Sequence, residues 1–145
     1  MYRYTESGLK NVRLMNGYAI KKTPYGKAVS IQDVEGLHRA IGSIIARRPK
    51  LTGPELRFLR KEMGLSQKGL ADFVGTSEQT VSLWERRGAV PKAADRLIKL
   101  AYLETVASRG GNVKIREMIE RLNAMDATAF HEMQLKKSGE WKEAA

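Results

Sequence analysis

A short polar segment between two glycines, Gly75 and Gly88, carries side chains that are well suited to binding a partner molecule. Its sequence, GTSEQTVSLWERRG, begins with small polar residues and ends in a charged run, while Val81 and Trp84 lie three residues apart. In a helix this spacing places both apolar side chains on one face and leaves the polar ones on the other. The segment therefore predicts a helix that is buried on one side and offers hydrogen-bonding groups on the other.

The outward side chains of this helix are of the types that contact base edges in the major groove of DNA. A glutamine such as Gln79 can bind adenine through N6 and N7, a contact worth about 1–3 kcal/mol of discrimination. Glu78 can accept a hydrogen bond from cytosine N4 or exclude wrong sequences, and Thr80 and Leu83 can meet thymine methyl groups. Taken alone, such residues also occur at ordinary solvated positions. The expected base-reading set is Glu78, Gln79, Thr80, Ser82 and Leu83.

Hydroxyl, amide and cationic side chains around this helix are suited to phosphate groups. Phosphate contacts position a protein on a duplex without reading its sequence, and cations add salt dependence to the binding. Ser77 and Gln67 lie at the starts of two expected helices, where free backbone N–H groups also favour anions. The expected phosphate-binding set is Gln67, Lys68, Ser77, Arg86, Arg87 and Lys92.

The first helix needed to hold this segment is marked by its two ends. Thr52, with Glu55 three residues later, forms a capping box, and Pro54 is tolerated in the first turn. Gly64 is expected to end the helix, with Leu65 folding back as in a Schellman cap. The inner face of this helix is expected to carry Leu56, Leu59 and Met63.

Further helices follow at short intervals. Ser66 is expected to cap the short helix QKGLADFV, and Gly75 provides the turn before the helix at 77–87. A long helix is expected from about Pro91 to Arg109, with Leu97, Ile98, Ala101 and Val106 as its apolar stripe. A final helix is expected from Asn112 to about Met125.

Two short helices joined by a glycine turn have the geometry of a helix-turn-helix. The run LSQKGLADFVGTSEQTVSLWERRGAVP closely resembles the Cro/phage-repressor (XRE) class of bacterial regulators, over roughly residues 54–105. The matching residues are Leu65, Ser66, Gln67, Leu70, Ala71, Gly75, Ser77, Val81, Trp84 and Glu85. This resemblance implies sequence-specific binding of double-stranded DNA through a recognition helix at 77–87. It also implies that Arg60 and Glu85 form a partly buried salt bridge that fixes this helix.

Residues 1–50 have the pattern of strands followed by a helix. NVRLM, YAIKK and KAVSI are short β-rich runs, Asn16–Gly17 suits a type I′ hairpin turn, and Thr23–Gly26 (TPYG) suits another turn. A helix is expected from Asp33, as N-cap, to about Arg47. Its apolar stripe is expected to be Val34, Leu37, Ile41, Ile44 and Ile45.

The expected fold class is mainly α, with a five-helix Cro/repressor-type domain preceded by a small β-hairpin or three-strand plus helix unit. Pro49 in RRPK disfavours helix in the residue before it and predicts a boundary. We expect a basic N-terminal unit at 1–50, the helix-turn-helix domain at 52–109, and a C-terminal helix and tail at 110–145 that serves dimerisation.

The distribution of charge supports a polyanionic partner. The chain has 145 residues and a net charge of +10. Residues 1–51 carry ten Lys/Arg against three Asp/Glu, residues 52–109 carry ten against seven, and residues 110–145 carry six against six. An excess of cations in the first two parts points most simply to nucleic acid.

Composition also excludes several classes of protein. The chain has no cysteine, which excludes disulfides and thiolate zinc sites, and its two histidines, His38 and His131, are isolated. We therefore expect no metal and no cofactor, and no catalytic residues, because no nucleophile–base pair or carboxylate cluster is present. The run AIGSII is too short for a membrane span, and the N-terminus lacks the apolar core of a signal peptide. We expect a cytoplasmic protein that joins the nucleoid by binding DNA.

The expected function is that of a transcriptional repressor that binds an inverted repeat as a homodimer. The candidate dimer surface is the stripe Ile115, Met118, Ile119 and Leu122, with the N-terminal unit second. The alternative is an antitoxin, because a small β unit before such a domain resembles antitoxin-type regulators, in which that unit is often a zinc ribbon that binds a toxin. Without cysteine, the unit is zinc-free here. Dimerisation, a second DNA contact and capture of an acidic partner remain alternatives for it.

Overall fold

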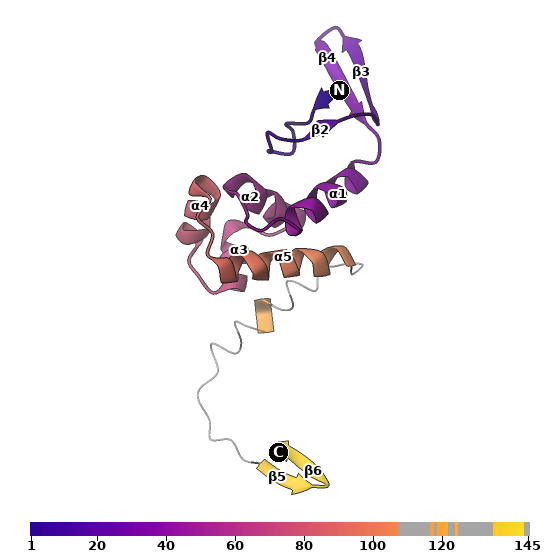
Figure 1. Cartoon of the computed structure of the whole chain (residues 1–145). Coiled ribbons are helices and arrows are strands. Elements are labelled where there is room, and N and C mark those ends of the chain that lie inside the picture. The colour runs from indigo at the N-terminus through magenta and orange to yellow at the C-terminus, as the bar shows by residue number, and fades with distance from the viewer. Residues whose placement is uncertain (108–116, 118, 122–123, 125–134, 144–145) are drawn as a thin grey trace.

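The computed structural model describes residues 1–107, 117, 119–121, 124 and 135–143, and it is mainly helical (Figure 1). Short antiparallel strand pairs precede the helices, as expected for the fold class. The elements in chain order are β1 (Tyr2–Arg3), β2 (Arg13–Leu14), β3 (Tyr18–Thr23), β4 (Gly26–Ile31), α1 (Val34–Ala46), α2 (Gly53–Glu62), α3 (Gln67–Val74), α4 (Glu78–Arg87), α5 (Lys92–Ala107), β5 (Leu135–Ser138) and β6 (Glu140–Glu143).

The β3–β4 hairpin turns at Pro24 and Tyr25, because Thr23 pairs with Gly26 at the end of the ladder. Proline suits the second position of such a turn since its φ is already fixed near the required value. The Thr23 hydroxyl donates to the Gly26 carbonyl at 2.6 Å, and the Tyr25 N–H donates to the Thr23 Oγ1 at 3.3 Å. The TPYG turn expected from the sequence is therefore present.

The hairpin expected at Asn16–Gly17 is wrong. A type I′ turn needs positive φ at both central residues, but Gly17 has φ of 78° and Asn16 is not in that region. The Gln32 N–H donates to the Gly17 carbonyl at 2.9 Å. Gly17 is therefore hydrogen-bonded at the open end of the β3–β4 hairpin and does not form a turn between β2 and β3. The preceding strand β2 pairs instead with β1, which the sequence did not reveal, and the expected three-strand unit is two separate pairs.

Helix α1 begins after Asp33, as expected. Asp33 has φ of 47° and its carboxylate accepts the Gly36 N–H at 3.0 Å. The expected apolar stripe is correct for Ile41 and Ile45, which are buried, and for Leu37, which is half-buried. It is wrong for Val34 and Ile44, whose exposed fractions are 43% and 47%.

Helix α1 packs closely on α5, and it also contacts α2. Gly42 lies directly against the Tyr102 side chain, and a methyl group at Gly42 would overlap the tyrosine hydroxyl. This close approach turns the opposite side of α1, including Ile44, toward solvent.

Helix α2 has both predicted ends. The Thr52 hydroxyl accepts the Glu55 N–H at 3.3 Å, and the Glu55 carboxylate accepts the Thr52 N–H at 3.0 Å, which completes the capping box. At the other end, the Leu65 N–H donates to the Arg60 carbonyl at 3.1 Å, as in a Schellman cap around Gly64. The inner-face residues Leu56, Leu59 and Met63 are all buried.

Helix α5 is rotated relative to the expected stripe. Ile98 and Ala101 are buried, but Leu97 and Val106 are exposed, so those two assignments are wrong. The buried face instead includes Asp95 and Lys99, along with Ala94 and Tyr102.

The two charged residues of this face are tolerated in the interior because they are paired. The Lys99 ammonium lies 2.5 Å from the Asp95 carboxylate and donates to the Arg48 carbonyl at 2.6 Å. The other Asp95 oxygen accepts the Leu51 N–H at 2.7 Å. Hydrogen-bonded pairing of this kind offsets much of the cost of burying charge, and it fixes the segment between α1 and α2 to α5.

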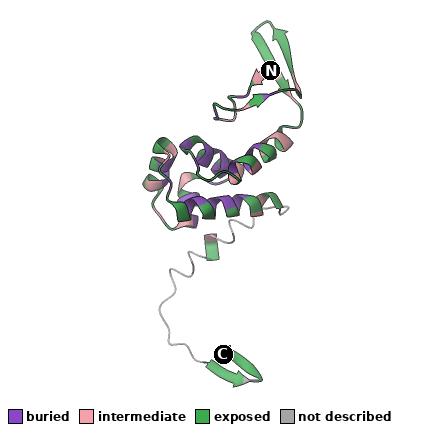
Figure 2. Ribbon diagram, in the orientation of Figure 1, coloured by how far each residue is buried: buried purple, intermediate pink, exposed green. Residues whose placement is uncertain are grey.

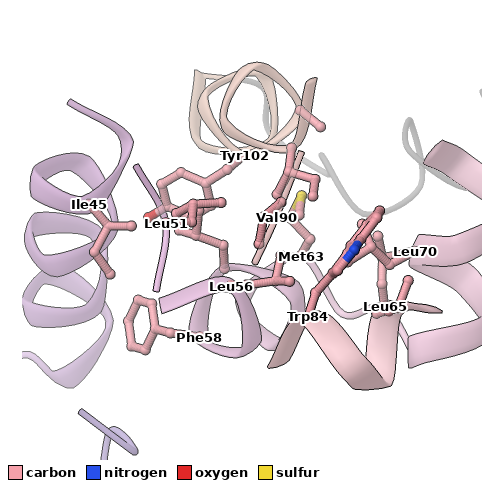
Figure 3. Packing of buried hydrophobic residues seen from close by; sticks show 14 of the residues in the cluster. Ile45, Leu51, Leu56, Phe58, Met63, Leu65, Leu70, Trp84, Val90 and Tyr102 are labelled. Atoms are coloured by element: carbon pink, nitrogen blue, oxygen red, sulfur yellow. The ribbon is translucent and has the colours of Figure 1, made fainter. Parts of the chain in front are cut away.

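One cluster of buried side chains joins the N-terminal strands, α1 and the later helices (Figures 2 and 3). It runs from Tyr4 and Leu14 through Ile45 to Leu56 and Tyr102. The cluster is thus continuous across the boundary expected at residue 50, and the three-part division of the chain stays a prediction.

Part of the expected final helix, Asn112–Met125, lies outside the described residues. Residues 117, 119–121 and 124 are described and are helical, and Ile119 is half-buried against the core cluster. The other stripe residues, Ile115, Met118 and Leu122, are not among those described. The β5–β6 hairpin, with Gly139 at φ of 78° in its turn, was not expected from the sequence. In the described residues, no helix is long and apolar enough to cross a membrane.

Candidate nucleic-acid interface

Helices α3 and α4 are joined by a tight turn at Gly75. Gly75 has φ of 87°, a left-handed conformation that glycine adopts without steric cost. Its N–H and that of Thr76 both donate to the Ala71 carbonyl, at 2.8 and 2.9 Å. The Ser77 hydroxyl then accepts the Thr80 N–H at 3.2 Å and caps α4. Two helices are thus set at a fixed angle with few intervening residues.

The inner face of α4 holds the helix to its own domain. Val81 and Trp84 are buried, as the spacing predicts, and the indole packs near Leu65 and Leu70 (Figure 3). Trp84 is therefore a core residue, and α4 presents its other face outward.

The predicted base-reading residues differ in how freely they face solvent. Glu78 and Gln79 are exposed in the first turn of α4, and Leu83 is also exposed. Thr80 and Ser82 are half-buried, and the Thr80 hydroxyl lies 2.8 Å from the Ser77 hydroxyl. The structure thus places all five along α4 and leaves Glu78, Gln79 and Leu83 the most accessible.

A charged pair ties the second half of α4 to α2. Arg60 Nε donates to Glu85 Oε2 at 2.7 Å, and Arg60 Nη2 donates to Glu85 Oε1 at 3.1 Å. The side chains are 10% and 6% exposed, and Arg60 Nη1 also donates to the Leu65 carbonyl at 3.0 Å. The salt bridge implied by the resemblance is present, and it fixes both the position and the rotation of α4.

A comparison with protein families matches residues 56–101 to a family described as helix-turn-helix. These residues contain α3, the Gly75 turn and α4, together with most of α2 and α5. Residues 56–101 are thus similar to helix-turn-helix domains of the Cro/C1 type. Domains of this family occur in DNA-binding transcriptional regulators. No curated protein and no solved structure matches the chain.

Within this Cro/C1-type domain, the predicted phosphate-binding cations are open to solvent. Lys68, Arg86, Arg87 and Lys92 are exposed, and none of them forms an ion pair with another described residue. Arg86 Nε lies 3.4 Å from the Ser82 carbonyl, so its side chain runs back along α4. These cations are free to meet an anion.

Gln67 is placed differently from the other members of the phosphate set. Its side-chain amide donates to Glu85 Oε1 at 3.3 Å, so it joins the charged pair that positions α4. Gln67 therefore links the start of α3 to α4 of the Cro/C1-type domain in addition to its expected place near a phosphate.

A basic residue that the site prediction left out lies beside the end of α4. A hollow between the start of α2 and the end of α4 is lined by Lys50, Arg86 and Arg87, among others. The start of α2 and the end of α4 are close here, because Gly53 lies against the Glu85 carbonyl. The run RRPK was the sequence signal for Lys50, but only the fold shows that it lies beside the two arginines.

His38 lies between two polar partners, and it lines a hollow that Glu85 of α4 also lines. Its Nε2 is 2.8 Å from the Tyr4 hydroxyl and its Nδ1 is 2.5 Å from Glu62 Oε1. Burial is the main reason that the pKa of Tyr4 is raised. This arrangement joins the N-terminal strands to α1 and α2, and the described residues include no group of three or more His, Cys, Asp or Glu that could hold a metal ion.

Proposed function

We propose that this chain is a sequence-specific regulator that inserts α4 into the major groove of an operator and reads bases with Gln79 and its neighbours. The observation that carries this proposal is the division of α4 into two faces. Val81 and Trp84 are buried, Arg60 holds Glu85, and Gln79 is exposed in the first turn. A rigidly held helix with hydrogen-bonding groups at its N-terminal end is the arrangement that helix-turn-helix proteins place in the groove.

The same proposal includes a homodimer on an inverted repeat. Two copies of α4 would enter successive major grooves about 34 Å apart. Leu97, Leu100 and Leu103 of α5 are exposed and follow one another at three-residue spacing, so they lie on adjoining parts of the helix surface, which such a dimer would bury. A dimer bound to its operator would repress transcription, because it prevents other proteins from binding the same DNA. We place this activity in the cytoplasm.

The test of the proposed function is a comparison of affinities for two duplexes. One duplex carries an operator selected from a random pool by the wild-type chain, and the other has random sequence. Gln79→Ala should weaken operator binding by about 5- to 150-fold, which corresponds to about 1–3 kcal/mol, with little change on random DNA. Gln32→Ala, at an exposed glutamine outside the helix-turn-helix domain, is the matched control. Equal losses on both duplexes would remove Gln79 as a base reader, and failure to select any operator would remove the proposal.

The antitoxin alternative is favoured by a different observation. Met1, Met15, Ile20 and Tyr25 of the N-terminal strands and their connections are all exposed, so this unit offers several large apolar side chains that a protein partner could cover. Under this alternative the N-terminal unit binds a toxin and DNA binding serves autoregulation. Purification of the native complex would distinguish the two: a stoichiometric toxin supports the antitoxin, and a chain that purifies only with copies of itself supports the plain regulator.

A further inference from the structure

The β3–β4 hairpin is a basic ribbon without a carboxylate. Lys21, Lys22 and Lys27 are all exposed, and residues 18–31 contain no Asp or Glu. The hairpin extends away from the helices beyond the start of α1, and its two strands are open to solvent over most of their length (Figures 1 and 2). Six residues at about 3.4 Å each make it about 20 Å long.

The strand register brings like charges together in both N-terminal strand pairs. Lys22 lies directly opposite Lys27 in the β3–β4 hairpin, and Arg3 lies directly opposite Arg13 in the β1–β2 pair. Like charges at directly opposite positions destabilise a strand pair. The structure therefore carries repulsion here that a bound anion would relieve.

Nothing in the described part of the chain neutralises these cations. None of Arg3, Arg13, Lys21, Lys22 and Lys27 forms an ion pair with a described residue. The sole carboxylate side chain of residues 1–32 belongs to Glu6, and it accepts a hydrogen bond from the Tyr2 hydroxyl. The N-terminal strands thus carry an excess of positive charge.

The C-terminal hairpin also carries lysines, but its strands contain carboxylates as well. The β5–β6 hairpin also pairs Lys136 with Lys142, but the same strands carry Glu140 and Glu143. Lysines at exposed edges also discourage pairing with foreign strands. Protection of a strand edge can be provided by single lysines and is compatible with nearby carboxylates. It therefore does not explain why β3–β4 has two lysines at one register position and no carboxylate.

We propose that the basic N-terminal ribbon, defined as Lys21, Lys22 and Lys27 of β3–β4 with Arg3 and Arg13 of β1–β2, binds phosphates of duplex DNA next to the site read by α4. This inference rests on the proposed function. The ribbon is rich in cations and residues 18–31 contain no Asn or Gln, so we assign its contact to the phosphate backbone, which cations bind without reading sequence. The ribbon adds affinity and salt dependence, and α4 supplies the selectivity.

The experiment is a salt titration of binding to a random-sequence duplex and to the selected operator with its flanking DNA. The triple variant Lys21→Gln, Lys22→Gln, Lys27→Gln should lower the slope of log affinity against log salt by about 2.7, if all three lysines contact phosphates. Between 50 and 200 mM salt the wild-type chain would then lose about 40-fold more affinity than the variant. The operator-to-random ratio should stay unchanged, because the ribbon does not read sequence.

The control has the same change of charge on the other ribbon, Lys136→Gln, Lys137→Gln, Lys142→Gln, and it should keep the wild-type slope. An unchanged slope in the N-terminal variant, or an equal decrease in the control, overturns the proposal. Loss of binding to an acidic protein with an unchanged DNA slope also overturns it, and assigns the ribbon to a protein partner. If the wild-type chain shows no operator selectivity but the N-terminal variant still has a reduced salt slope, the ribbon contact is supported. Only the proposed function is then overturned.

Discussion

The Arg60 guanidinium holds the Glu85 carboxylate through two hydrogen bonds, Nε to Oε2 at 2.7 Å and Nη2 to Oε1 at 3.1 Å. Removing one partner of a buried pair leaves the other charge without compensation. Glu85→Ala should therefore lower the free energy of unfolding by about 3–5 kcal/mol, measured by urea denaturation. Glu35→Ala, at an exposed position in the first turn of α1, should cost less than about 1 kcal/mol. Similar losses in the two variants would show that the pair contributes no special stability.

Gly53 gives a second test of how α4 is positioned. A methyl group at this residue would overlap the Glu85 carbonyl, which is backbone and cannot turn aside. Gly53→Ala should therefore separate the start of α2 from the end of α4 and cost about 1–3 kcal/mol in thermal or urea unfolding. Gly69→Ala is the matched control, because a methyl group there meets the Ser66 hydroxyl at 3.3 Å and no backbone. Helix propensity favours alanine at Gly69 by about 0.5–1 kcal/mol, so its effect should be small.

The helices around the site could be predicted because their signals are local. Thr52 with Glu55, Ser66, Ser77 and the glycines that follow each helix act within a few residues of sequence, and the structure forms those caps. The β3–β4 hairpin could be predicted as well, because its TPYG turn is a local signal. The pairing of β1 with β2 could not: Asn16–Gly17 has a strong local preference for a hairpin, but β2 pairs with the more distant β1, Tyr2 with Leu14 and Arg3 with Arg13.

The candidate site was predictable in its residues and less so in its contacts. Spacing alone distinguished the buried Val81 and Trp84 from the exposed Gln79. It could not show that the Gln67 amide reaches Glu85, or that Lys50 lies beside Arg86, because both contacts join elements that are separate in sequence. The prediction of the buried face of α5 was wrong for a related reason. Asp95 and Lys99 are buried because they pair with each other and with the backbone of residues 48 and 51. A hydrophobicity pattern does not reveal such contacts.

Ionisation of Tyr102 is expected to lower the stability of the fold at alkaline pH. Burial raises its pKa above 10.0, the charge of Glu62 raises it further, and Arg39 opposes this. A pKa that is raised on folding stabilises the protein below the unfolded value, and this contribution is lost as pH rises through the folded value. The urea midpoint should therefore fall above pH 10, and Tyr102→Phe should reduce that fall. Tyr25→Phe, at the fully exposed hairpin tip, is the control. An identical alkaline decrease in wild type and Tyr102→Phe would contradict the assignment.

Leu100 tests the proposed dimer, because it is the most exposed leucine of α5, at 65%. It lies on the outward side of the helix with Leu97 and Leu103, three residues away on either side. If this surface is buried between two copies, Leu100→Asp places a charge in an apolar interface and should give a monomer in analytical ultracentrifugation. Operator affinity should then fall far more than affinity for a single half-site, because the two recognition helices no longer bind as one unit. Leu135→Asp is matched in exposure, at 61%, and should leave both the mass and the affinity unchanged. A dimer that survives Leu100→Asp would place the interface elsewhere on the chain.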